Sequence, residues 1–276
     1  MSTCFFEAAA MKEKILFICL FPLAALLLSG CVAEMVYHPA SGVEQSPADI
    51  GLSYEKLRFR TSDGVALSGW WVPAAGAEKT VLFFHGNAGN IGGRLDTIRI
   101  IRSMGFNLFI FDYRGFGESE GSPSKNGLYR DADAAFGFLT EQMGISPGSV
   151  VLWGRSLGGA VAAQCAARHP AGMLILESTF TSMKDAADDL FFWVPGFVLR
   201  NHAYETLRYL EKADIPTLVI HSPDDEVIDF SHGRRLYEAA PGQKSFIELQ
   251  GSHNYGFLRS EDVYVAGILQ FIASVR

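Results

Sequence analysis

The stretch that decides the fold runs from Val150 to Ala160 and reads VVLWGRSLGGA. Its first four residues are apolar, with the β-branched and aromatic side chains of a strand that is buried on both faces. A small-residue helical pattern follows and continues through Arg168. Between strand and helix, residues 154–158 match GxSxG, the pattern of a nucleophile elbow. The stretch therefore predicts a reactive serine at Ser156.

The two glycines of this pattern have a steric role. The turn is so tight that side chains at Gly154 and Gly158 would collide with neighbouring backbone, and we expect the serine to take a strained conformation. The turn lifts Ser156 Oγ out of the sheet and places it at a helix N-terminus, where free N–H groups and the helix dipole favour developing negative charge.

The elbow strand is one of eight segments with strand character. Residues 54–60 and 66–72 alternate on either side of a turn at 62–64, which predicts an antiparallel hairpin. Apolar runs separated by helix-length segments predict a mostly parallel, doubly wound sheet. These strands are Thr80–Phe84, Asn107–Phe111, Val150–Trp153, Met173–Leu176, Thr217–Ile220 and Ser245–Leu249. A last helix is expected at Asp262–Val275.

Composition narrows the class of protein. A chain of 276 residues with 49% hydrophobic content can build one sizeable α/β domain. The net charge of −7 and the lack of a basic stripe argue against a nucleic-acid partner. The spacing of His, Cys and carboxylate residues suggests no metal, and GRSLGG does not form GxGxxG, so no cofactor is expected.

The candidate base follows the last strand. Ligands bind at the carboxyl ends of parallel strands, and a nucleophilic serine needs a base that is oriented by a third group. His253 lies in a Gly-Ser-His-Asn loop where no apolar pattern requires a histidine. His85 and His221 also follow strands, but both precede the expected acid, and we interpret them as loop-structuring groups.

The acid is expected between the penultimate strand and His253. The candidates Asp224, Asp225, Glu226 and Asp229 all fall in that interval. At this point the chain resembles the α/β-hydrolase superfamily, whose pattern places the acid at Asp225. Ser222 stands where that family usually has glycine. Asp224 is the alternative acid, and Glu177 is a more remote one.

Two further loops carry the same resemblance, which covers the chain from about Tyr54 onward. FFHGNAGN at 83–90 and DYRGFGESEG at 112–121 look like the small, depalmitoylase-like serine hydrolases of this superfamily. The resemblance implies an oxyanion hole made by the backbone amides of Asn87 and Leu157. Removing one such donor typically costs about 3 kcal/mol of transition-state stabilisation.

The N-terminus reads as a targeting segment. Lys12 and Lys14 precede an apolar run at 15–28 that is too short to span a bilayer comfortably, as in a signal peptide. Residues 28–31, LSGC, resemble the lipobox of bacterial lipoproteins, which implies a lipid anchor on Cys31. An uncleaved anchor and an ordinary cleavable signal are the alternatives, and either Met1 or Met11 is the start.

The same resemblance implies a location. The residue after the cysteine is Val32, without the aspartate that retains lipoproteins of enteric type in the inner membrane. We therefore expect a protein of the bacterial cell envelope, held on the outer membrane and facing the periplasm if the cell has one.

The expected domain organisation has three parts: a signal peptide at 1–30, a tether at 31–52 and an α/β-hydrolase domain at 53–276. A cap insertion is expected at about 178–210, with an apolar run at 190–199. This run either packs over the sheet edge as a short cap or lines an acyl pocket through Phe191, Phe192 and Trp193.

The residues together predict a serine hydrolase that cleaves a carboxylic ester or thioester through an acyl-enzyme on Ser156 at the membrane surface. Its substrate would be a small molecule or an acyl chain such as palmitate. A peptidase, an amidase and an acyltransferase would use the same triad and remain alternatives. A non-catalytic, surface-tethered binding protein is the alternative of a different class.

Overall fold

The computed structural model describes residues 36–190 and 203–275. The chain divides into two compact units, Met1–Tyr37 and His38–Arg276, and the second contains all the elements below. The predicted signal peptide, Cys31, Phe191, Phe192 and Trp193 lie outside the described residues. Within the described ranges, no helix is both long enough and apolar enough to cross a membrane.

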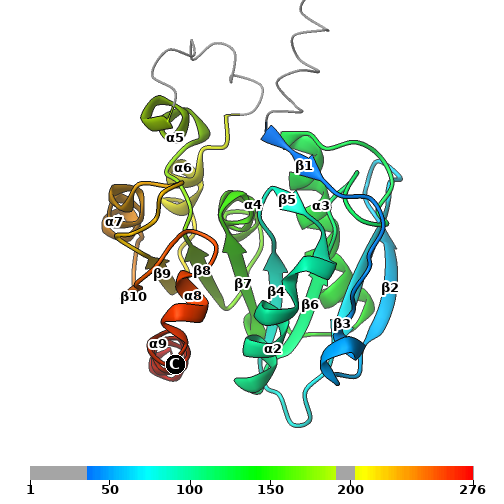
Figure 1. Cartoon of the computed structure of the whole chain (residues 1–276). Helices are drawn as coiled ribbons and strands as arrows, with labels where there is room; N and C mark the ends of the chain where they lie inside the picture. Colours follow the sequence, from blue (N-terminus) through cyan, green and yellow to red (C-terminus); the bar gives the residue numbers. More distant parts are fainter. Residues whose placement is uncertain (1–35, 191–202, 276) are drawn as a thin grey trace, which may run out of the picture. The chain divides into compact units, whose positions relative to one another are not determined.

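An eight-stranded sheet forms the centre of this unit (Figure 1). Its strands are β2 (Glu55–Arg60), β3 (Ala66–Val72), β4 (Thr80–Phe84), β6 (Asn107–Phe111), β7 (Val150–Arg155), β8 (Met173–Glu177), β9 (Thr217–His221) and β10 (Lys244–Glu248). Their order is β10-β9-β8-β7-β4-β6-β3-β2, and the pairs from β10 to β6 are parallel. Strand β3 is antiparallel to both neighbours, β2 and β6. The predicted sheet with its N-terminal hairpin is therefore confirmed.

Helices cover both faces of the sheet, as a doubly wound fold requires. They are α2 (Leu95–Ser103), α3 (Lys125–Gly137), α4 (Leu157–Ala166), α5 (Met183–Leu190), α6 (Thr206–Leu210), α7 (Phe230–Ala239), α8 (Gly256–Arg259) and α9 (Glu261–Ser274). Shorter elements are β1 (His38–Pro39), η1 (Pro47–Ile50), β5 (Ala88–Gly89), η2 (Ile91–Arg94), η3 (Phe138–Gln142) and η4 (Pro147–Ser149). Helices α2 and α9 share one apolar cluster with the sheet, whereas α3, α4, α6 and α7 pack in succession against one another.

The central strands are buried on both faces because helices cover both. All five residues of β4 are buried, and alternate side chains point to opposite faces. Val81 and Phe83 therefore belong to the same cluster as Ile98 of α2 and Ile268 of α9. This two-sided burial explains why these strands read as continuous apolar runs rather than as alternating ones.

The segment at 38–52 is folded, although a tether was expected there. Strand β1 pairs in parallel with β5, and the N–H groups of His38 and Ala40 donate to Asn87 O (2.9 Å) and Gly89 O (3.0 Å). Asn90 Nδ2 donates in turn to Ala40 O at 3.2 Å. The compact unit therefore begins at His38 rather than at residue 53. A two-residue strand has no periodicity, so the sequence could not reveal it.

Helices α5 and α6 occupy the described part of the expected cap insertion. Backbone hydrogen bonds join its two ends, from Met183 N to Tyr204 O and from Leu207 N to Thr181 O, both at 2.9 Å. Helix α6 packs against α4, the helix that follows the elbow (Figure 1). The insertion therefore lies beside the helix that carries the candidate nucleophile at its N-terminus.

Candidate active site

Ser156 lies in the turn between β7 and α4. Its φ and ψ are 54° and −123°, a conformation that non-glycine residues rarely adopt. Its backbone is held on both sides, because Ser156 N donates to Glu177 O at 2.9 Å and Thr179 Oγ1 donates to Ser156 O at 2.7 Å. The strained elbow predicted from the sequence is present, and the neighbouring strand β8 and the residues after it hold it in place.

The two glycines of the elbow are required by close backbone contacts. A Cβ atom at Gly154 would overlap Gly158 O, and one at Gly158 would overlap Phe84 O at the end of β4. The helix α4 therefore starts directly against two strand ends. The steric explanation inferred from GxSxG holds in the folded chain.

A hydrogen-bonded chain runs from Ser156 through His253 to Asp225. Ser156 Oγ is 3.2 Å from His253 Nε2, and His253 Nδ1 lies 2.8 and 3.0 Å from the two Asp225 carboxylate oxygens. Asp225 follows β9, and His253 follows β10. When the Nδ1–H of His253 donates to Asp225, Nε2 can accept the proton of the serine hydroxyl. Three segments that are distant in sequence thus meet at the carboxyl ends of the strands.

Asp225 is held as an anion. Burial alone would raise the pKa of its carboxyl group, but hydrogen bonds from His221, His253 and the Ile228 amide outweigh burial and lower that pKa below its usual range. Oδ1 accepts from the amides of Val227 (2.9 Å) and Ile228 (2.8 Å). His221 Nε2 lies 3.4 Å from Oδ2. Asp225 therefore presents a fixed negative charge to His253.

The alternative acids have other partners. Asp224 Oδ2 accepts from Gly251 N, and Glu226 Oε2 accepts from His253 N, both at 3.0 Å. Both carboxylates therefore fix the backbone of the histidine loop rather than its imidazole ring. Glu177 is buried and accepts a hydrogen bond from Arg155 Nε at 2.7 Å.

A buried polar network lies beneath the elbow around Glu177. Besides Arg155, the side chains of Trp153 (3.0 Å) and Tyr264 (2.7 Å) donate to this carboxylate. The Arg155 guanidinium also lies 3.9 Å from the centre of the Phe257 ring. The network ties α8 and α9 to the strand that ends in the nucleophile, a structural role that the sequence did not indicate.

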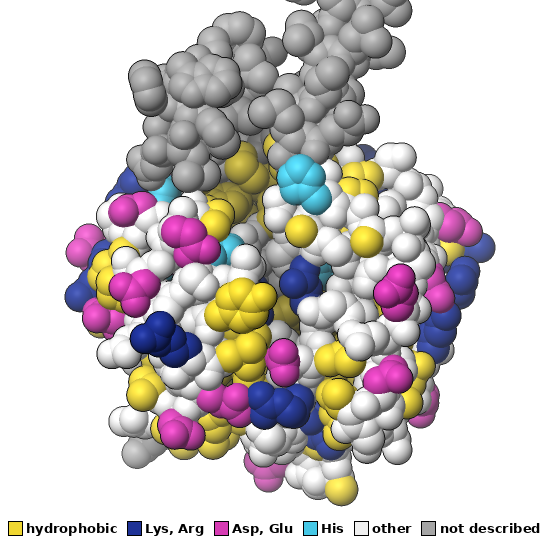
Figure 2. Space-filling model, viewed as in Figure 1, with side chains coloured by type: hydrophobic (Ala, Val, Ile, Leu, Met, Phe, Trp, Pro, Cys, Tyr) yellow, Lys and Arg dark blue, Asp and Glu magenta, His cyan; other side chains and the backbone are white. Residues whose placement is uncertain are grey.

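One predicted oxyanion-hole residue, Leu157, follows the serine directly, and the other, Asn87, lies in a loop that approaches it. The loop at 86–90 passes over the elbow, since a Cβ at Gly86 would lie 3.6 Å from Ser156 Cβ. Asn87 is the next residue of that loop. Leu157 is the first residue of α4, where amides have no intrahelical partner. Figure 2 shows a hollow in the surface, with α8 on one side and α2 and β5 on the other. Histidine side chains and Lys or Arg side chains lie along it.

His85 and Asp112 form a buried pair below this loop. His85 Nδ1 is 2.7 Å from Gly86 O, and its Nε2 is 3.6 Å from Asp112 Oδ1, which accepts from Ile91 N at 2.9 Å. Burial, followed by the charge of Arg94, lowers the pKa of His85 to about 3, and burial raises the pKa of Asp112 to about 7. At neutral pH His85 is therefore a neutral group that shapes the loop.

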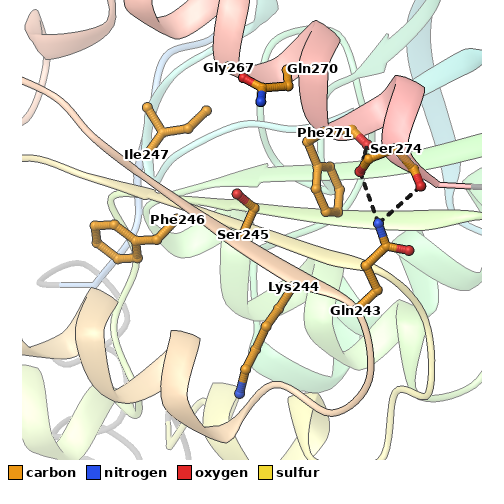
Figure 3. A pocket seen from close by; sticks show the side chains of 9 residues that line it. All are labelled: Gln243, Lys244, Ser245, Phe246, Ile247, Gly267, Gln270, Phe271 and Ser274. Atoms are coloured by element: carbon orange, nitrogen blue, oxygen red, sulfur yellow. Dashed lines mark hydrogen bonds between the residues drawn. The ribbon is translucent and has the colours of Figure 1, made fainter.

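A second hollow lies between the edge strand β10 and α9 (Figure 3). It is a cavity of about 270 Å³, and Gln243 Nε2 donates across one end to Ser274 O (3.2 Å) and Ser274 Oγ (2.9 Å). None of the residues of the hydrogen-bonded chain lines it. It is therefore separate from the candidate active site.

Comparison with known proteins identifies the family of this chain. The α/β-hydrolase domain-containing protein WAV2 of Arabidopsis thaliana is 35% identical over 274 residues, covering 89% of each chain. The chain belongs to the α/β-hydrolase family. A family model described as the alpha/beta hydrolase fold matches residues 79–207 of this chain. The uncharacterized membrane protein YNL320W of Saccharomyces cerevisiae is 38% identical and covers 76% of both chains.

Solved structures share the fold of this α/β-hydrolase. The esterase Pf2001 of Pyrococcus furiosus superposes with a TM-score of 0.72 at 19% identity, covering 86% of this chain and 97% of Pf2001. At that identity the likeness establishes the fold, and function has to be argued from the site.

The close contact at Gly158 generates a prediction about stability. Gly158→Ala should lower the free energy of unfolding by more than about 3 kcal/mol, because the added methyl group meets backbone atoms that cannot move aside. Gly93→Ala is the matched control, since a Cβ there has no neighbour within 4 Å. Urea unfolding followed by circular dichroism measures both variants. Equal stability of the two would show that the elbow is looser than described.

Proposed function

We propose that this protein is a serine hydrolase that cleaves a carboxylic ester or thioester through an acyl-enzyme on Ser156. The observation that carries the proposal is the hydrogen-bonded chain from Ser156 Oγ through His253 to the Asp225 carboxylate. A serine hydroxyl becomes a competent nucleophile when a base within hydrogen-bond reach takes its proton.

The reaction follows from the positions of these groups. Ser156 Oγ attacks the substrate carbonyl while His253 Nε2 takes the hydroxyl proton, and the imidazolium that forms is stabilised by Asp225. The amides of Asn87 and Leu157 would stabilise the oxyanion of the tetrahedral intermediate. His253 then gives its proton to the leaving alcohol or thiol. A water molecule attacks the acyl-enzyme by the same steps and releases the acid.

The structural neighbours and the cap insertion indicate the class of substrate. The structural neighbours Pf2001 and a Rhodothermus marinus domain are named as esterases, which favours ester substrates over amides. The apolar run at 190–199 of the insertion would contact an acyl chain through Phe191, Phe192 and Trp193, and the alternative is that it only packs over the sheet edge as a short cap. An amidase or acyltransferase would share the acyl-enzyme and differ in the group that is cleaved or that accepts the acyl chain.

We also propose that the enzyme is held on the bacterial cell envelope by a lipid on Cys31, on the periplasmic face of the outer membrane if the cell has one. The LSGC sequence at 28–31 supports the anchor, and one relative is named as a membrane protein. From Cys31 to His38 the chain advances seven residues, which reach about 25 Å at most when fully extended. A lipid at Cys31 would therefore keep β1, and the loop that pairs with it, close to the bilayer and to acylated substrates.

Covalent labelling tests the nucleophile. A fluorophosphonate probe should label the wild-type protein and fail to label Ser156→Ala, because the probe phosphorylates only an activated serine. Ser252→Ala, next to the base in the sequence, is the control and should be labelled like wild type. In-gel fluorescence measures the reaction. Equal labelling of wild type and Ser156→Ala would overturn the proposed function.

Two adjacent aspartates test the identity of the acid. Asp225→Asn should lower kcat for 4-nitrophenyl esters by about 10⁴-fold, since the uncharged amide cannot hold the imidazole in the required tautomer. Asp224→Asn keeps an acceptor for Gly251 N and should lower kcat by less than about tenfold. Steady-state kinetics measures both variants. The opposite order of losses would assign the acid to Asp224.

Metabolic labelling tests the anchor. In cells grown with an alkyne fatty acid, the wild-type protein should acquire the label and sediment with outer membranes. Cys31→Ser should do neither, since it lacks the thiol that carries the lipid. Cys19→Ser, within the same targeting segment, is the control and should behave like wild type. Label on Cys31→Ser would contradict the lipoprotein assignment.

A further inference from the structure

Arg94 lies beside the candidate oxyanion hole. It is the last residue of η2, and its Nη2 donates to Ala88 O, one residue beyond Asn87. A Cβ at Gly89 would lie 3.9 Å from the same nitrogen. The guanidinium therefore borders the loop that passes over Ser156.

Arg94 also acts electrostatically on the ends of the strands that form the site. Its charge lowers the pKa of His85 at the end of β4 and opposes the charge of Arg155 at the end of β7. Asp112, directly after β6, attracts it. These three positions are the carboxyl ends of neighbouring strands, where ligands bind in this class of fold.

The positive charge of Arg94 has no carboxylate partner in the described part of the chain. Among the side chains that the structure describes, no carboxylate oxygen lies within 4.0 Å of its nitrogens, and its Nε is buried without a hydrogen-bond acceptor. The two buried arginines nearest in sequence differ in this respect. Arg114 pairs with Asp63 and Asp131, and Arg155 pairs with Glu177.

An unpaired charge in a partly buried position is costly, and buried charges in proteins are normally paired. The one hydrogen bond to Ala88 O does not require a charge, because a neutral amide could donate it. A guanidinium has five N–H donors in a fixed fork, and Ala88 accepts from one nitrogen only. The remaining donors suit the oxygen atoms of a carboxylate or a phosphate from outside the protein.

We infer that Arg94 binds a negatively charged group of the substrate, a carboxylate or a phosphate, beside the oxyanion hole. The inference rests on the proposed hydrolase function and narrows its substrate to acidic esters or thioesters. Charge-assisted hydrogen bonds from Arg94 would orient the anion while Ser156 attacks a carbonyl a few bonds away. Arg94 would thus decide which ester is bound.

Paired substrates test this specificity. One pair places the charge on the acyl side, mono-4-nitrophenyl adipate against 4-nitrophenyl hexanoate. The other pair places it on the leaving group, 4-hexanoyloxybenzoate against its methyl ester. For at least one pair, Arg94→Met should lower the ratio of anionic to neutral kcat/KM by about ten- to a hundredfold, mainly through KM. Arg94→Lys should restore part of the ratio, because it keeps the charge and loses the fork.

Arg99→Met is the matched control on the neighbouring helix. Arg99 is exposed and pairs with Glu261 at the surface, so its loss should leave both ratios unchanged. Equal losses of Arg94→Met on anionic and neutral esters would overturn the inference, since Arg94 would then only shape the loop. Absence of Ser156-dependent turnover of all four esters would overturn the hydrolase proposal instead.

A binding measurement tests the inference without any turnover of substrate. Adipate and inorganic phosphate are added separately to Ser156→Ala, and the thermal midpoint is followed. At least one anion should raise the midpoint of Ser156→Ala and fail to raise that of the Ser156→Ala, Arg94→Met double variant. The anion that acts distinguishes a carboxylate from a phosphate substrate. Equal shifts, or no shift with either anion, would show that Arg94 binds no substrate anion.

Discussion

The structure depends on one close contact, the approach of Gly158 in α4 to the backbone of Phe84 at the end of β4. Because no side chain fits there, the helix can start directly against the sheet, and Ser156 is forced into its strained conformation. The same contact brings the loop after β4 over the nucleophile. The serine and both candidate oxyanion amides thus share one steric constraint.

The arrangement of charges follows from this tight turn. Below the elbow, Arg155 is neutralised by Glu177, so the strand that ends in the nucleophile can be fully buried. Beside the elbow, Asp225 stays ionised, because amides and two histidines satisfy its oxygens. Above it, Arg94 lacks such a partner among the described residues. The paired charges support the scaffold, and Arg94 is the group that we infer binds the substrate anion.

Chain connectivity explains how the site is held together. Parallel strands place the loops after β4, β7, β9 and β10 at one edge of the sheet, which brings Asn87, Ser156, Asp225 and His253 together. Strand β1 adds support from the N-terminal side, since its backbone pairs with the loop at 87–89. The segment that follows the proposed membrane anchor therefore also holds the candidate oxyanion loop.

The sequence by itself determined the elbow, the eight strands and the order of the candidate triad. A strand that is buried on both faces has a continuous apolar sequence, and a tight elbow requires glycines at fixed spacing. Both features can therefore be recognised from a short stretch of sequence. Only the tertiary structure showed that Asp225 faces the His253 ring and that Asp224 faces the Gly251 amide, because neighbouring carboxylates differ only in which group each one faces. It also revealed β1, the network around Glu177 and the position of Arg94. Such contacts join residues far apart in the chain, and no local pattern encodes them.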